Sequence, residues 1–150
     1  MNLRIPPVAQ FVACALLSWA LSSVFAELAL SWSGMLFLAA VFMTLGIVTL
    51  TIAVAAFVRA STTVNPMAPE QAKHLVTNGL YRYSRNPMYL GLLCVLLGSA
   101  FYSENLAAFM GPVLFVWLMT ELQIKPEERA LQLKFGEAFA DYRRTTRRWI

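Results

Sequence analysis

Four long apolar stretches restrict how this chain can fold more than any other feature of its sequence. They cover approximately Val8–Leu30, Leu36–Val58, Met88–Tyr102 and Leu106–Ile124. A helix rises about 1.5 Å per residue, so stretches of this kind can cross roughly 30 Å of hydrocarbon. The third is the shortest, and we expect it to gain length from the polar residues before it. Only 13% of residues are charged, against about a quarter in soluble domains. We therefore predict a single all-α domain, a polytopic membrane protein with four transmembrane helices.

The distribution of charge predicts how these helices are oriented. Short connections, Ser31–Gly34 and Ser103–Asn105, predict two antiparallel hairpins. Neither connection carries a basic residue. All 12 basic residues precede the first stretch, separate the second from the third, or follow the fourth. The positive-inside rule then places both termini and the central loop in the cytoplasm, with the chain in the cell (inner) membrane.

A possible signal segment and two cysteines also bear on how the apolar stretches are interpreted. The run from Arg4 to Ala26 also has the pattern of a cleavable secretory signal. It is longer than a usual signal core, however, and cleavage would leave one hairpin incomplete, so a retained helix is favoured. Cys14 and Cys94 are interpreted as small apolar residues inside helices. Because the chain has one histidine, no metal site is predicted.

Residues 75–91, LVTNGLYRYSRNPMYLG, form a polar, aromatic and basic block directly before an apolar helix. Asn78-Gly79 predicts a turn. Asn86-Pro87 predicts a helix start, with asparagine as N-cap and proline in the first turn. The positive end of this helix dipole would face the cytoplasmic membrane surface.

Three glycines are expected to shape the apolar helices. Gly91 and Gly98 lie seven residues apart and share one helix face, where small side chains allow close helix packing in lipid. Gly111-Pro112 is expected to kink the fourth helix.

A second polar region follows the fourth apolar stretch. Residues 125–128 read KPEE, which predicts a junction and a new helix with acidic residues in its first turn. Apolar residues then recur at helical spacing through residue 142. This pattern predicts an amphipathic cytoplasmic helix that either lies on the membrane or folds back over the core. The basic segment 143–149 is expected to contact anionic headgroups.

Together these motifs resemble the isoprenylcysteine carboxyl methyltransferase family and the related phospholipid methyltransferases. The resemblance rests on Leu75-Val76-Thr77-x-Gly79-x-Tyr81, Arg85-x-Pro87-x-Tyr89-x-Gly91, Glu127-Glu128-x-x-Leu131, Phe135-Gly136 and Tyr142. It covers roughly residues 73–150 and keeps the order and spacing of the family motifs.

The resemblance implies an integral membrane enzyme that transfers a methyl group from S-adenosyl-L-methionine to a lipophilic or small acceptor. By motif position, the implied cofactor contacts are Lys73, His74, Leu75, Val76, Tyr81, Asn86, Pro87, Met88, Tyr89 and Glu127. Glu127, Glu128 and Tyr89 are the candidate catalytic residues. A carboxylate or thiolate acceptor would need no general base, whereas an amine would have to lose a proton. No nucleic-acid partner is expected.

Three positions depart from the family pattern. Asn86 replaces a histidine, and Lys73 replaces another, with His74 one place out of register. Gln123 replaces the arginine that meets the substrate carboxylate in prenylcysteine enzymes, so that substrate is in doubt. Gln123, Lys125 and Arg129 are the candidate substrate-binding residues, because either cation could take the place of the missing arginine.

Two alternative functions stay open at this point. Sterol reductases share a related C-terminal architecture and bind NADPH, although this chain is short for them and its polar block lacks an extra basic cluster. A non-catalytic membrane subunit with a decayed pocket is the other alternative. The sequence leaves the acceptor and the oligomeric state open.

Overall fold

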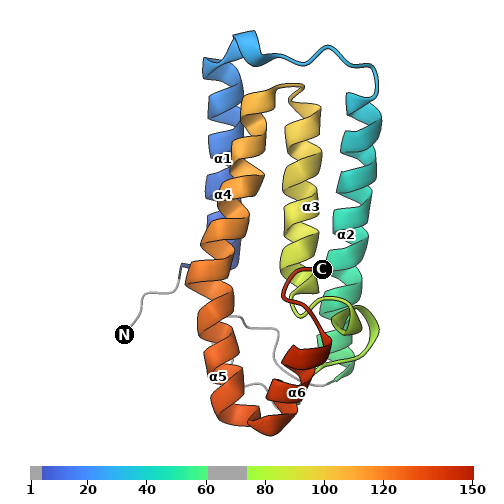
Figure 1. Ribbon diagram of the computed structural model, residues 1–150. Coiled ribbons are helices and arrows are strands. Elements are labelled where there is room, and N and C mark those ends of the chain that lie inside the picture. Colours follow the sequence, from blue (N-terminus) through green and yellow to red (C-terminus); the bar gives the residue numbers. More distant parts are fainter. Residues whose placement is uncertain (1–4, 61–73) are drawn as a thin grey trace.

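The computed structural model describes residues 5–60 and 74–150, and these residues form a bundle of upright helices (Figure 1). The long elements are α1 (Pro7–Val24), α2 (Met35–Arg59), α3 (Pro87–Tyr102), α4 (Met110–Leu118), α5 (Lys125–Phe135) and α6 (Glu137–Thr145). Short 3₁₀ turns are η1 (Ala26–Leu28), η3 (Gly79–Arg82) and η4 (Leu106–Phe109). The predicted all-α class is confirmed for the described residues.

Within residues 5–60 and 74–150, three helical segments are long and apolar enough to cross a membrane: Pro7–Val24, Met35–Arg59 and Leu106–Phe135. Helix α3 is apolar but shorter, with 16 residues. The side chains that face outward are accordingly apolar, with Trp19, Phe37 and Val58 each more than 60% exposed. A bilayer is the solvent that such a surface requires.

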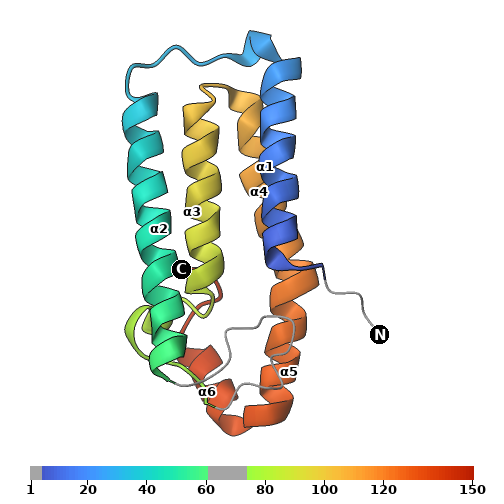
Figure 2. The same ribbon diagram turned by 180° about the vertical axis from the view of Figure 1, so that it is seen from behind.

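The first predicted hairpin is wrong in its details. Helix α1 ends at Val24 rather than Leu30, and the connection to Met35 runs across one end of the bundle to α2 at the opposite edge (Figure 1, Figure 2). Backbone and side-chain bonds to the α3–α4 connection hold it there. Leu30 N donates to Glu104 O at 2.7 Å, and Asn105 Nδ2 donates to Phe25 O at 2.8 Å. These bonds hold the mostly apolar residues 25–30 in the connection, although their apolar character alone would allow α1 to continue through them.

Helix α2 packs closely along α3, and glycines permit the contact. A methyl group at Gly46 would lie 2.7 Å from the carbonyl oxygen of Gly91, and one at Gly98 would lie 3.0 Å from that of Ala39. Helix α1 packs against α4 in the same manner, since a methyl group at Gly111 would lie 2.5 Å from Cys14 O. The packing role predicted for Gly91 and Gly98 is confirmed.

The junction predicted at residues 125–126 is confirmed in part: α5 begins at Lys125 with Pro126, Glu127 and Glu128 in its first turn, but no break separates it from the fourth helix. A π-helical turn, η5 (Met119–Ile124), joins α4 directly to α5. Pro126 lacks the N–H that an α-helix would use there, and a π turn accommodates such a break in the hydrogen-bond pattern. The predicted amphipathic segment after residue 125 forms two helices. Helix α5 ends at Phe135, and Gly136 follows with a φ of 53°, which favours glycine. Helix α6 then returns toward α3 (Figure 1).

Candidate active site

Tyr89, Gln123 and Glu127 meet where the start of α3 faces the π turn and α5. The Tyr89 hydroxyl donates a hydrogen bond to Glu127 Oε1 at 2.6 Å, and Gln123 Nε2 donates to the same oxygen. Gln123 is fully buried and Tyr89 is 7% exposed. Since Gln123 and Glu127 are four residues apart on continuous helix, both present their side chains to Tyr89. We call this contact the α3–α4 seam, because the π turn with Gln123 and helix α5 with Glu127 continue directly from α4.

Tyr81, Val76 and Met88 form the apolar part of the region that the motifs predicted. Tyr81 and Val76 pack with buried Ala53 of α2, and Met88 contacts both this cluster and the one that contains Tyr89. The Tyr81 ring lies edge-on to Phe57, with centroids 5.2 Å apart. Burial raises the pKa of Tyr81, and nearby Tyr142 and Glu127 raise it further. The charge of Glu127, the carboxylate that Tyr89 binds, therefore also acts on Tyr81.

Glu128 has different partners from Glu127. Its two carboxylate oxygens accept from Arg85 Nη2 and Arg148 Nη2, each at 2.7 Å, and Arg148 Nε adds a bond of 3.0 Å. The Glu128 and Arg85 side chains are each only 10% exposed. The hydrogen bonds that Arg148 donates to Glu128 raise the pKa of Arg148. One acidic side chain thus joins α5, the turn before α3 and the C-terminal segment.

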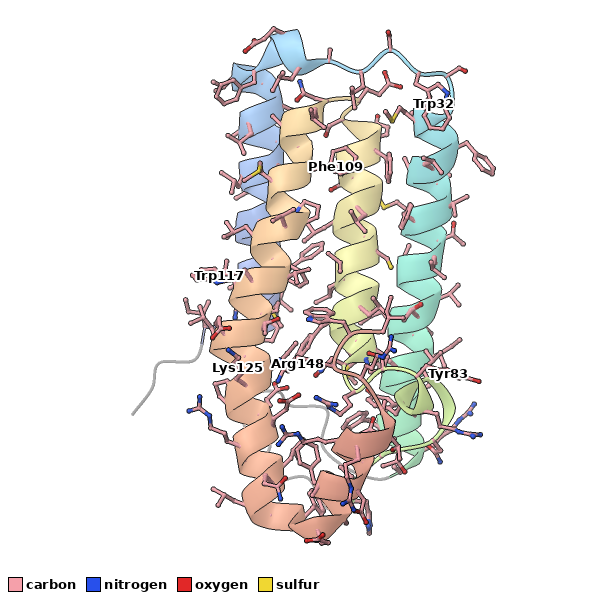
Figure 3. The ribbon with its side chains drawn as sticks, viewed as in Figure 1. Trp32, Tyr83, Phe109, Trp117, Lys125 and Arg148 are labelled. Atoms are coloured by element: carbon pink, nitrogen blue, oxygen red, sulfur yellow. The ribbon has the colours of Figure 1, made fainter. Side chains whose placement is uncertain are left out.

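Residues Thr146–Trp149, which we call the C-terminal strap, run beside the residues that precede α3. Arg85 N donates to Arg147 O at 2.9 Å, and Asn86 Nδ2 donates to Arg148 O at 2.9 Å. Figure 3 shows Arg148 between the helices, while Lys125 points to the outside of α5. Asn86 is at the predicted N-cap position, but its side chain makes no capping bond and holds the strap instead.

Other predicted site residues occupy a range of positions. Pro87 opens α3 and is fully buried. His74 is exposed and Leu75 is half-buried, while Lys73 lies outside the described residues. Lys125 pairs with Glu121 on the outer face of the helix, and Arg129 is exposed. The expectation that Lys125 or Arg129 replaces the missing arginine is not supported, because both lie on the opposite side of the helix from Gln123 and Glu127.

Sequence reasoning missed the inward role of the basic C-terminal segment. Thr146 is buried, and Arg148 and Trp149 are partly buried, whereas Arg143, Arg144 and Arg147 are exposed and their contact with headgroups stays a prediction. The Tyr142 hydroxyl also reaches back to donate to Tyr81 O at 2.6 Å. One signal was present: two adjacent glutamates next to an apolar helix need cationic partners if either is buried.

The donor set suits the cofactor that the motifs imply. Glu127 offers a carboxylate for an ammonium or ribose hydroxyl group, and Tyr81 and Tyr89 offer aromatic surface nearby. Arg85 Nε is buried and, in the part of the chain that the structure describes, has no hydrogen-bond partner. A buried guanidinium donor of this kind favours a carboxylate. The described residues therefore fit S-adenosyl-L-methionine.

Comparisons with known proteins identify the family of the chain. Residues 34–138, more than half of the chain, match the phospholipid methyltransferase family. An uncharacterized protein of Haemophilus influenzae is 36% identical over 63 residues, which cover 42% of this chain and 100% of that protein. Protein-S-isoprenylcysteine O-methyltransferase of Schizosaccharomyces pombe is 33% identical over 70 residues, covering 47% of this chain and 30% of the yeast enzyme.

No solved structure matches the chain significantly. The reductase and non-catalytic alternatives find no support in these matches. The family match spans α2, the polar block, the π turn and α5, which together contain every residue of the α3–α4 seam. The chain is thus a membrane methyltransferase by descent, and it belongs to the phospholipid methyltransferase family.

Proposed function

We propose that this protein transfers a methyl group from S-adenosyl-L-methionine to a lipophilic or small acceptor at the cytoplasmic face of the cell membrane. The observation that carries the proposal is the 2.6 Å hydrogen bond between Tyr89 and Glu127. It brings the two family motifs, which are 38 residues apart in sequence, together in one largely buried contact.

The proposed membrane arrangement has four spanning helices. Helix α3 would cross with help from the polar residues before it, because its apolar part is short. The described basic residues lie at the end of α2, in the polar block and after α4, which is the end of the bundle that contains the α3–α4 seam. By the positive-inside rule, this end would face the cytoplasm. Helices α5 and α6 would then lie below the inner leaflet and cover the site.

Each residue of the site has a proposed task. Glu127 accepts hydrogen bonds from the amino group or the ribose of the cofactor, and Tyr89 holds the Glu127 carboxylate in place. Arg85 Nε donates to the carboxylate of the cofactor, and the backbone of residues 74–76 contacts its adenosine part. Tyr81 forms an apolar wall. The cofactor supplies a methyl group already activated by its sulfonium.

With an activated methyl group, the chain has mainly to orient the acceptor and exclude water. Orientation alone can lower a barrier by roughly 7–11 kcal/mol. The buried surroundings of Tyr89 and Gln123 favour such exclusion. A neutral amine acceptor would also have to lose its proton, and Glu127 is the nearest described carboxylate to Tyr89. Glu128 is held by two arginines, so we propose a positioning role for it rather than a chemical one.

Calorimetric titration of the purified protein with S-adenosylhomocysteine and with NADPH tests the proposal. We expect S-adenosylhomocysteine to bind and NADPH not to bind. Glu127→Gln should weaken S-adenosylhomocysteine binding about tenfold or more, since hydrogen bonds to charged groups contribute roughly 1.5–3 kcal/mol. Glu137→Gln, on the exposed first turn of α6, is the matched control and should bind as the unmodified protein does. Binding of NADPH alone would overturn the assignment.

A further inference from the structure

The indole of Trp149 packs inward at the α3–α4 seam. Its Nε1 donates to Thr120 Oγ1 in the π turn at 3.2 Å. The ring packs against the buried cluster that contains Tyr89, Met119 and Ile124. Trp149 therefore touches the group of side chains whose polar edge is the Tyr89–Glu127 hydrogen bond.

The backbone of the C-terminal strap fixes the indole in this position. Besides the bonds of Arg147 O and Arg148 O to residues 85 and 86, Thr146 Oγ1 donates to Arg82 O at 3.3 Å. The Arg148 side chain is held by Glu128. These contacts are independent of the bond to Thr120. The bulk of the indole would thus stay at the seam even if that single hydrogen bond were lost.

Other tryptophans of the chain have a different environment. Trp117, one turn before Thr120 on the same helix, is 60% exposed and points outward (Figure 3). Trp19 is 68% exposed. Such residues are typical of contact with lipid. Trp149 is partly buried and bonded inward, so its position calls for a separate explanation.

We propose that Trp149 is the specificity-determining residue of the acceptor site, and that it limits the bulk of the lipid chain admitted from the bilayer to the α3–α4 seam. This inference rests on the proposed function. A lipophilic acceptor has to bring its reactive group to the neighbourhood of Tyr89 and Glu127 while its chain stays in an apolar environment. On the apolar side of that pair stands the cluster that Trp149 covers, so an acceptor chain would lie against the indole.

Photocrosslinking tests this inference without knowledge of the natural acceptor. The full-length protein is reconstituted in phosphatidylcholine vesicles that contain either of two phosphatidylethanolamine probes, each with a diazirine in one acyl chain. One probe chain is straight and the other is methyl-branched. Mass spectrometry then measures labelling at Tyr89 and Met119. The variants are Trp149→Ala, Trp149→Leu and Trp149→Phe, with Thr120→Val and Trp117→Ala as controls.

We expect the unmodified protein to be labelled at these residues mainly by the straight probe. Trp149→Ala should raise the ratio of branched to straight labelling by about tenfold, the discrimination that hydrophobic pockets achieve per methylene group. Trp149→Leu should give an intermediate ratio, and it serves alone if Trp149→Ala does not fold. Trp149→Phe keeps most of the bulk and should resemble the unmodified protein, as should Thr120→Val and Trp117→Ala.

Two results would overturn the inference. An unchanged ratio in Trp149→Ala and Trp149→Leu would show that the indole does not limit access. Equal increases in Trp149→Phe and Thr120→Val would show that the hydrogen bond, and therefore a structural role, matters instead of bulk. S-adenosylhomocysteine affinity is measured in parallel and should be the same in all variants. If the unmodified protein did not bind S-adenosylhomocysteine, the proposed function would be contradicted, whereas the labelling ratio tests only the role of Trp149.

Discussion

Helix α3 makes two contacts of opposite character. Toward α2 it presents Gly91 and Gly98, and the two backbones approach so closely that even a methyl group would clash. Toward the π turn and α5 it presents Tyr89, whose hydroxyl meets a carboxylate and an amide. The first contact leaves no volume for a ligand, while the second places polar groups in a partly buried setting. The difference supports the proposal that the α2–α3 pair is scaffold and that the reaction takes place at the α3–α4 seam.

The largest effect is expected from adding bulk to the scaffold contact. Gly46→Leu should prevent α2 from packing on α3, because its Cβ alone would lie 2.7 Å from a carbonyl oxygen of Gly91. Overpacking usually costs about 1–3 kcal/mol, and we expect this substitution to exceed that range. The yield of monodisperse protein and its thermal unfolding in detergent measure the loss. Ala40→Leu, on the exposed side of α2, is the control; equal loss in both variants would contradict a special role of this contact.

A smaller effect is expected when the ion pairs that join Glu128 of α5 to Arg85 and to Arg148 of the C-terminal strap are broken. Glu128→Gln leaves Arg85 and Arg148 without their anion, and breaking a buried ion pair costs about 3–5 kcal/mol. We expect the low end, since the amide can still accept hydrogen bonds. Thermal unfolding measures the change. Glu121→Gln removes an ion pair whose side chains are about 40% exposed and should cost at most about 1 kcal/mol. Similar losses of stability in the two variants would contradict a special role of the Glu128 ion pairs.

The hydrogen bond between α6 and the polar block should have a still smaller effect. Tyr142→Phe removes the donor to Tyr81 O and should lower stability by about 1 kcal/mol. Tyr83→Phe, at a position that is 75% exposed, should leave the unfolding temperature unchanged. If Tyr142→Phe also left it unchanged, α6 would contribute little to holding the block.

The same tyrosine predicts a pH dependence. Burial raises the pKa of Tyr142 in the folded protein, whereas in the unfolded chain tyrosine ionises near pH 10. The stability that the buried, neutral Tyr142 phenol contributes is therefore fully present below about pH 10, and it is lost as the pH rises toward the pKa of Tyr142 in the folded protein. Unfolding temperatures of the unmodified protein should fall above that pH, and those of Tyr142→Phe should fall less steeply. Parallel profiles would contradict burial of this hydroxyl.

Local patterns predicted much of the fold, because their causes are local. The apolar stretches gave the helices, Asn86-Pro87 gave the start of α3, and the glycine spacing gave the packed face of α3. The features missed at Leu30 and before Lys125 have non-local causes. Bonds between the two end connections stop α1 early, and a π turn, which no local pattern predicts, joins α4 to α5 without a break.

The candidate site could be predicted only in part for the same reason. The motifs identified Tyr89 and Glu127, which the structure brings together. They assigned the cofactor contact to Glu127 and not to Glu128, but they did not predict the partners of Glu128, because Arg85 and Arg148 come from distant segments. Trp149 looked like a headgroup anchor because an amphipathic residue after a basic run is equally typical of both environments. Its inward position follows from strap pairing that no short-range pattern encodes.

The central claim is that Tyr89 and Glu127 act as one cofactor-binding unit, and a double-mutant cycle tests it most directly. S-adenosylhomocysteine affinity is measured calorimetrically for the unmodified protein, Tyr89→Phe, Glu127→Gln and the double variant. Coupled residues in contact show interaction energies of about 0.5–3 kcal/mol. We predict at least about 1 kcal/mol, so that the double variant binds little worse than Glu127→Gln alone. Additive losses, or no loss in either single variant, would contradict the account.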